Sequence, residues 1–101
     1  MELVVLRAGH PVVTLPIDSE RISIGRAGTN DLAIPDPAVS RHQCVLRREK
    51  NGLWLKDSSG QGTLVDGKLY SEVELKPESR IQFGELAITL RRREEEVAPA
   101  T

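Results

Sequence analysis

Residues 53–70 read LWLKDSSGQGTLVDGKLY, and this stretch decides the fold class. Three short runs of strand-forming residues, at 53–56, 63–65 and 68–70, alternate with clusters of Asp, Ser and Gly. Asp66-Gly67 suits a two-residue hairpin turn, because Asp tolerates and Gly favours the positive φ that such a turn needs. The stretch therefore predicts strands joined by a loop and a hairpin.

The same pattern extends to both sides of this stretch. Runs that alternate or are rich in β-branched residues occupy positions 3–7, 11–15, 21–24, 43–48, 80–83 and 86–90, and Asn51-Gly52 supplies a second hairpin signal. Short period-two runs with turn residues at brief intervals are typical of an all-β sandwich or barrel. We predict no helix before residue 91.

The length and charge of the chain exclude several classes of function. A chain of 101 residues is one domain with one modest core. Its 14 Lys and Arg balance 15 Asp and Glu, which speaks against direct binding of nucleic acid. We find no apolar run of about 18 residues and no polybasic segment, and so expect no membrane binding. Cys44 is the only cysteine, which excludes an internal disulfide and fits a cytoplasmic protein.

The chain divides at its charged end. Residues 1–90 form the predicted domain, and residues 91–101, RRREEEVAPAT, read as a charged tail or a linker to a further domain of a longer chain. A partner could therefore be another domain of that chain.

Three predicted loops, at 25–31, 35–42 and 57–63, hold most of the small polar residues and glycines. A phosphate dianion is bound by arginine forks, by hydroxyl or amide donors, and by backbone that glycine allows to approach closely. If the loops meet, these donors come from Arg26, Ser40, Arg41, Gln61 and the amides of Gly60 and Gly62. Asp57, at the start of a tight loop, is expected to cap backbone amides.

The sequence gives little support for an enzymatic function. The sequence holds no Gly-x-Ser-x-Gly, no Walker loop and no His-Glu-x-x-His. His10, His42 and Cys44 are the only histidines and cysteine, too few for a zinc site. Because Cys44 alternates with Leu46, we expect it in the core. We predict a chain without catalytic residues, metal or cofactor.

The order of five motifs resembles the forkhead-associated (FHA) domain over about residues 3–90. The motifs are Gly25-Arg26, residues 30–34, Val39-Ser40-Arg41, residues 55–67, and Leu75 followed by residues 81–84. The resemblance implies an eleven-stranded, antiparallel-type β-sandwich of two twisted sheets. It also implies recognition of a phosphothreonine-containing protein or peptide, in bacterial-type Ser/Thr phosphorylation signalling or transcription regulation.

The resemblance also assigns roles. Arg26 matches the arginine that contacts the phosphate, Ser40 the serine that contacts it through hydroxyl and amide, and Arg41 a position that adds a further contact. Gly25 lets the strand turn so that Arg26 points into the site.

Two departures from the family pattern leave an alternative open. The family's loop-bracing histidine, three residues after the serine, is Gln43 here, so either Gln43 or the neighbouring His42 braces the loop. The usual Ser/Thr-Asn-Gly-Thr is Gly60-Gln61-Gly62-Thr63, with Thr63 retained as structural support. The alternative is therefore a degenerate FHA sandwich that binds a protein partner without phosphate.

Overall fold

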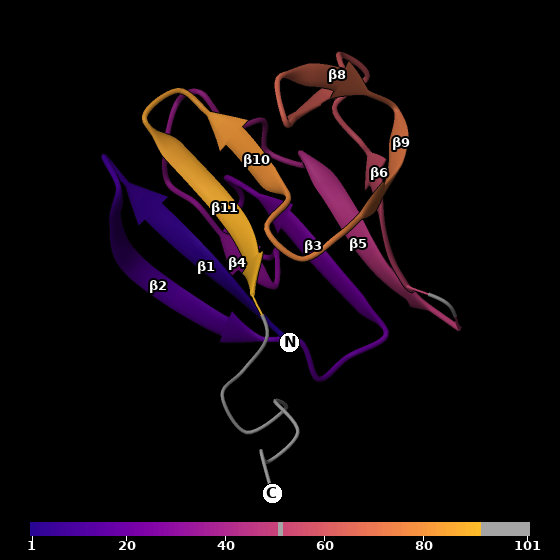
Figure 1. The fold of residues 1–101 in the computed structure, drawn as a ribbon. Coiled ribbons are helices and arrows are strands. Elements are labelled where there is room, and N and C mark those ends of the chain that lie inside the picture. Colours follow the sequence, from indigo (N-terminus) through magenta and orange to yellow (C-terminus); the bar gives the residue numbers. More distant parts are fainter. Residues whose placement is uncertain (51, 92–101) are drawn as a thin grey trace, which may run out of the picture.

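A computed structural model describes residues 1–50 and 52–91 (Figure 1). Within these residues, eleven strands form two packed sheets, which confirms the predicted sandwich. In chain order the strands are β1 (Glu2–Arg7), β2 (His10–Pro16), β3 (Arg21–Gly25), β4 (Leu32–Ala33), β5 (Cys44–Glu49), β6 (Gly52–Asp57), β7 (Thr63–Val65), β8 (Lys68–Tyr70), β9 (Glu72–Leu75), β10 (Arg80–Phe83) and β11 (Leu86–Arg91). Among the described residues there is no helix that could cross a membrane.

The six-stranded sheet has the order β2-β1-β11-β10-β7-β8. All five pairs of neighbouring strands in this sheet are antiparallel, and Val65 of β7 faces Lys68 of β8 across the hairpin. Asp66 and Gly67, the two residues between them, have φ values of 50° and 86°. The hairpin predicted from Asp66-Gly67 is confirmed.

The five-stranded sheet has the order β4-β3-β5-β6-β9, and it contains two strands that the sequence did not predict. β4 is only two residues long and pairs with β3 in parallel, so the sandwich is not wholly antiparallel. β9 begins with a glutamate and contains a second one, and glutamate is depleted in strands. Both strands are set by their partners more than by their own composition.

Two predicted boundaries need correction. Gly52 belongs to β6 and pairs with Glu49, so it is a strand residue and not a central turn residue. Asn51 lies outside the described residues. β11 runs through Arg91, the first residue of the predicted tail, whose guanidinium forms an ion pair with the Glu2 carboxylate. Residues 92–101 of that tail lie outside the described part of the chain.

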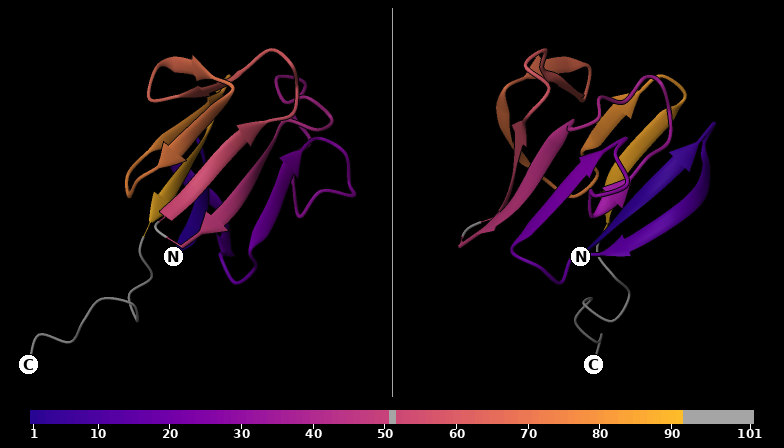
Figure 2. Two further views of the ribbon diagram at one scale, coloured as in Figure 1. Left: turned by 90° about the vertical axis from the view of Figure 1, so that its right-hand side faces the viewer. Right: turned by 180° about the vertical axis from the view of Figure 1, so that it is seen from behind.

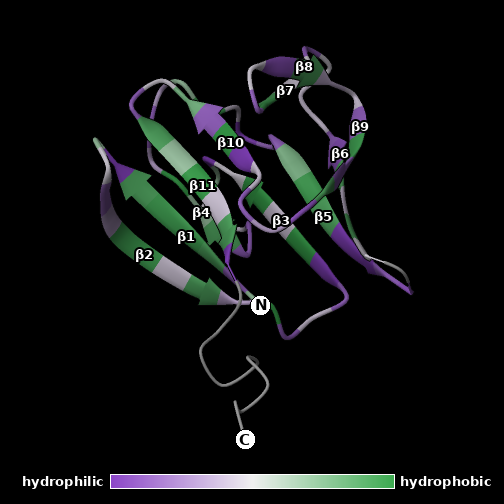
Figure 3. Cartoon of the chain, in the orientation of Figure 1, coloured by the Kyte–Doolittle hydropathy of each residue, from purple (hydrophilic) through white to green (hydrophobic). Residues whose placement is uncertain are grey.

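The core lies between the sheets and takes buried residues from every described strand except β2 and β8. Leu3, Ile24, Leu55 and Ile88 are fully buried, and Figure 3 shows β1 as a largely apolar strand. Cys44 is buried too, as its alternation predicts. Burial, and then the nearby negative charge of Asp57, raises the pKa of its thiol to about 12, against a smaller opposite effect of a hydrogen bond with Thr63.

Gly25, the last residue of β3, lies against the backbone of a distant loop. A Cβ placed on it would stand 2.2 Å from the Arg41 carbonyl oxygen and 2.8 Å from Asn30 Nδ2. Real side chains do not approach backbone so closely, so only glycine fits. The glycine is required by this close approach, which brings the segment after β3 against the one that precedes β5.

We predict that Gly25→Ala destabilises the fold by about 1–3 kcal/mol, the usual cost of forcing extra atoms into a packed site. Urea unfolding followed by circular dichroism measures the change. Gly28→Ala is the matched control, because a Cβ at Gly28 meets nothing within 4 Å. Equal stability of the two variants would contradict the account.

Candidate functional site

Three strands bring the predicted loops to one end of the sandwich. Ile24 of β3 pairs with Cys44 of β5, and Cys44 pairs with Asp57 of β6. The end of β3, the start of β5 and the end of β6 are therefore in register. Figures 1 and 2 show this end opposite the one that holds the N-terminus.

The loops on either side of β4 are tied to each other by backbone hydrogen bonds. The amide of Arg26 donates to the Ser40 carbonyl at 2.9 Å, and the amide of Ala27 to the Arg41 carbonyl at 3.2 Å. Asn30 reinforces the contact, because its Nδ2 donates to the carbonyls of Ala27 and Arg41, each at 2.8 Å. Arg26 and Ser40, 14 positions apart in the sequence, are thus neighbours.

Asn30 is a site residue that our sequence reasoning missed. It stands in the segment 30–34 that contributed to the family resemblance, but its side chain had no assigned role. The only sequence signal was its place in a glycine-bordered loop, where asparagine commonly bonds to backbone.

Gln43 braces the loop that carries Ser40. Its Oε1 accepts a hydrogen bond from the Ser40 amide at 3.0 Å, and its Nε2 donates to Thr63 Oγ1 at 3.1 Å. Gln43 is buried, whereas His42 is exposed and makes no side-chain hydrogen bond to the described residues. Of the two residues considered for bracing, Gln43 occupies the bracing position in this structure.

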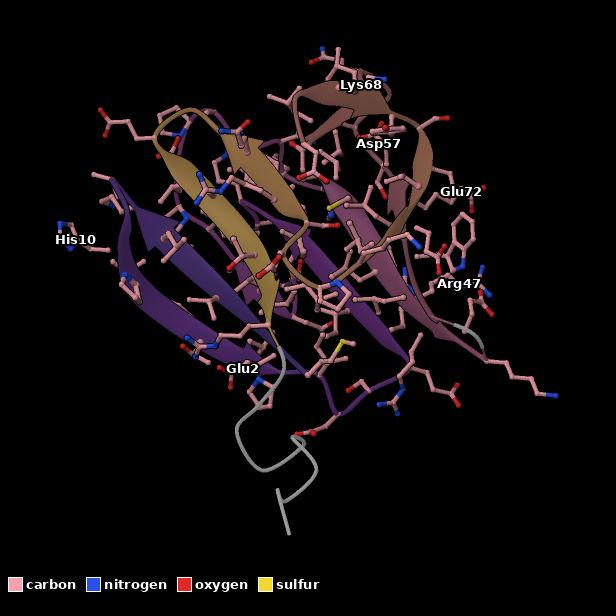
Figure 4. All side chains as sticks on the ribbon, in the orientation of Figure 1. Glu2, His10, Arg47, Asp57, Lys68 and Glu72 are labelled. Carbon is pink, nitrogen blue, oxygen red and sulfur yellow. The ribbon has the colours of Figure 1, made fainter. Side chains whose placement is uncertain are left out.

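Asp57 organises the third loop, and Figure 4 shows it at this end of the sandwich. Its Oδ1 accepts hydrogen bonds from the hydroxyls of Ser59 and Thr63, both at 2.8 Å. Its Oδ2 accepts the amides of Gly60 at 2.9 Å and Gly62 at 3.1 Å. Burial alone would raise the pKa of Asp57, but these four hydrogen bonds outweigh it and hold the pKa below its usual value.

The capping role of Asp57 limits which backbone amides of the third loop can bind a ligand. Because the Gly60 and Gly62 amides both point at Asp57, they are not free to meet a phosphate, in contrast to the expectation from sequence. The Ser40 amide is likewise committed to Gln43. Ser40 therefore presents only its hydroxyl, and the glycines shape the loop through their positive φ values of 82° and 88°.

Four predicted groups remain unpaired within residues 1–50 and 52–91: the guanidiniums of Arg26 and Arg41, the Ser40 hydroxyl and the Gln61 carboxamide. Arg26 forms no ion pair with Asp31 or Asp57, the acids of the first and third loops, within these described residues. Both acids have other partners, since Asp31 accepts the amide and hydroxyl of Ser23 at 2.8 and 3.1 Å. Among the described residues, this end of the sandwich therefore carries two unpaired guanidiniums. The carboxylates of Asp31 and Asp57 are both held by other donors.

A shallow hollow of about 350 Å³ lies beside these groups. Ser40, Gln61 and Gly62 line it together with apolar side chains that include Leu64, Leu69 and Phe83. Arg26 and Arg41 are not part of its lining. A larger hollow, of about 460 Å³, lies around Met1, Ile17 and Pro77 and includes none of the predicted site residues.

No cluster of His, Cys, Asp and Glu in the described ranges could hold a metal ion. The groups that the loops leave free are donors and cations. Their chemistry suits a bound anion.

Comparison with known proteins gives one family and several related folds. The model of the FHA domain matches residues 22–84. The chain is 34% identical to the ABC transporter ATP-binding/permease protein Rv1747 of Mycobacterium tuberculosis, over 90% of this chain and 11% of that protein. It therefore spans about a ninth of this relative's length.

Two solved structures illustrate the likeness of fold. The FhaA FHA domain, crystallised with the intracellular domain of Rv3910, has a TM-score of 0.77 and 25% identity, covering 89% of this chain and 98% of that one. EmbR of Mycobacterium tuberculosis, in complex with a low-affinity phosphopeptide, has a TM-score of 0.74 and 21% identity, covering 89% of this chain and 24% of that one. Since the family model matches more than half of the sequence, this chain belongs to the FHA domain family.

Proposed function

We propose that this domain recognises a phosphothreonine-containing peptide and performs no chemical step, as an adaptor in cytoplasmic Ser/Thr phosphorylation signalling or transcription regulation. The observation that carries the proposal is the backbone contact between Arg26 and Ser40. It joins a free guanidinium and a free hydroxyl on two loops whose positions are fixed by Gly25, Asn30 and Gln43.

The chemistry follows from these donors. In the proposed complex the Arg26 fork donates two charge-assisted hydrogen bonds to phosphate oxygens, and the Ser40 hydroxyl donates a third. Arg41 adds a second positive charge, and the Gln61 carboxamide bonds to the backbone of an extended peptide. The Asp57 charge would oppose phosphate, but its four donors are already turned toward it.

The comparisons support this proposal. The resemblance to FHA domains implies phosphothreonine recognition, and one structural neighbour, EmbR, was solved with a phosphopeptide. Another neighbour, FhaA, was solved with the intracellular domain of a second protein. A protein segment that carries phosphothreonine is therefore the partner we propose, either in a separate protein or in a longer form of this chain.

One observation favours a second candidate function. Because the amides of Ser40, Gly60 and Gly62 are all engaged internally, fewer donors remain for phosphate than the family pattern implies. The second candidate is a partner-binding sandwich whose contacts do not depend on phosphate. The two functions differ in whether removal of the phosphate abolishes binding.

We predict that Arg26→Ala weakens phosphopeptide binding by roughly ten- to a hundred-fold, because hydrogen bonds to a charged group are worth about 1.5–3 kcal/mol. Calorimetric titration with members of a phosphothreonine peptide library measures the change. Arg80→Ala is the matched control, since Arg80 is exposed at the start of β10 and distant in sequence from all three loops. Equal affinity for phosphorylated and unphosphorylated peptides would favour the second candidate.

We also predict that Gln43→Ala frees the Ser40 amide and leaves Thr63 with one hydrogen bond fewer. Loss of the buried partner should destabilise the fold by about 1–3 kcal/mol and weaken phosphopeptide binding through misplacement of Ser40. Amide hydrogen exchange gives the direct readout: exchange at Ser40 should accelerate by more than exchange at Ile34, whose amide bonds to the Gly25 carbonyl. An unchanged ratio of the two rates would refute the bracing role.

A further inference from the structure

The outer face of the five-stranded sheet carries an ordered row of side chains. Arg21 pairs with Arg47, Arg47 with Trp54, and Trp54 with Glu74, so these four residues cross β3, β5, β6 and β9 in register. Their strand neighbours Ile22, Leu46 and Leu55 are buried in the core. The row therefore lies on the opposite face of the sheet, away from the six-stranded sheet.

This face exposes the only tryptophan of the chain. Trp54 is 38% exposed and lines a hollow of about 320 Å³ together with Arg47, Glu49, Lys56 and Glu72. Figure 4 shows Arg47 and Glu72 projecting outward, on the side of the molecule away from His10. Tryptophan and arginine are enriched at the centres of protein interfaces, where each contributes large contact area.

Charge is segregated across the row. The two arginines of the row stand on β3 and β5, Glu74 stands on β9, and Trp54 lies between them on β6. Glu49 and Lys56 add one charge of each sign beside the row. Two ion pairs on this face, Arg47 with Glu49 at 3.6 Å and Glu74 with Lys76 at 3.8 Å, are long and exposed. Such pairs contribute little and are easily exchanged for others.

We propose that this face binds a second copy of the chain. A two-fold axis parallel to the strands, passing between β5 and β6, would set β5 of one copy over β6 of the other and β3 over β9. The row Arg21-Arg47-Trp54-Glu74 of one copy then lies over the same row of the second copy in reverse order. Arg47 covers the indole of Trp54 of the second copy in a cation–π contact, and Arg21 faces Glu74 of the second copy.

The second outward row meets the same axis less well, because Glu72 of the second copy would lie over Ser23, whose hydroxyl already donates to the Asp31 carboxylate. It consists of Ser23, Val45, Lys56 and Glu72 in register. The axis sets the aliphatic stem of Lys56 over Val45 of the second copy, so that no two lysines face each other. Two sheet faces commonly pack in this way, with strand directions within about 30° of each other.

The size of the face sets the strength of the dimer. Four strands at a spacing of about 4.8 Å extend over roughly 14 Å, so the contact falls short of the roughly 800 Å² per partner of a standard interface. We therefore expect a weak dimer, with a dissociation constant on the order of 0.1–1 mM.

Because the axis runs along the strands, the loop ends of both copies point in the same direction. If the proposed function holds, the dimer presents two phosphopeptide sites to one partner.

Sedimentation equilibrium of the 101-residue chain over about 0.02–2 mM, a range that brackets the expected constant, tests the proposal. Tryptophan fluorescence over the same range reports on the interface itself, since Trp54 is the only tryptophan. We expect the mass to rise toward that of a dimer, with a blue shift of the emission and slower quenching by acrylamide. Neither readout requires a phosphopeptide, so failure here and failure of the proposed function are distinguishable.

Charge reversal then identifies the contact. Arg21→Glu and Glu74→Arg should each weaken association by about tenfold or more, because a two-fold dimer contains the altered contact twice. An equimolar mixture of the two variants, or both changes in one chain, should restore it. Arg80→Glu, on the other sheet, should leave association unchanged.

Two results would overturn the proposal. One is a monomer across the whole concentration range, which would leave this face to another partner or to solvent. The other is a dimer that neither reversal weakens, which would mean that the copies meet elsewhere. If a single reversal fails to fold by circular dichroism, the chain with both changes decides the matter by dimerising or remaining monomeric.

Discussion

The Asp57 carboxylate fixes the loop end of this sandwich. It stands at the last position of β6 and gathers four donors, two of them hydroxyls and two of them backbone amides. One of those hydroxyls, that of Thr63, also accepts a hydrogen bond from Gln43, which in turn holds the Ser40 amide. A continuous set of hydrogen bonds therefore runs from the third loop to the second.

The same set of bonds separates groups that build the site from groups that can bind. Amides of Ser40, Gly60 and Gly62 are used to hold the loops in place, and the close contact at Gly25 locks the first loop against the second. What stays available is the outer layer of Arg26, Arg41, the Ser40 hydroxyl and Gln61. A preorganised site of this kind loses little entropy when an anion binds, because its loops are already ordered.

Much of the fold was predictable from local sequence. Alternation placed Cys44 and Leu46 in the core, and Asp66-Gly67 gave the hairpin with both φ values positive. The parallel β4 and the acidic β9 were missed, because a two-residue strand has no period and glutamate is depleted in strands. Those strands depend on partners far away in the sequence.

The site was predictable in its members but not in its hydrogen bonds. The motifs assigned both Arg26 and Ser40 to one phosphate site, but the backbone hydrogen bond between them lies beyond the end of the β3–β5 pairing and outside its register. The direction of the Gly60 and Gly62 amides was not predictable, because it depends on loop dihedrals that sequence alone does not define. Nor could the sequence choose between Gln43 and His42, since the choice depends on which side chain points inward.

An NMR titration of the labelled domain with a phosphothreonine peptide separates the groups that bind the phosphate from the amides that hold the loops. We expect the largest shifts at the Arg26 guanidinium, the Gln61 carboxamide and the residues beside the Ser40 hydroxyl, while the Gly60 and Gly62 amides keep their protection by Asp57. Saturable binding with no shift at Arg26 or near Ser40, or with exposure of the two glycine amides, would contradict this expectation.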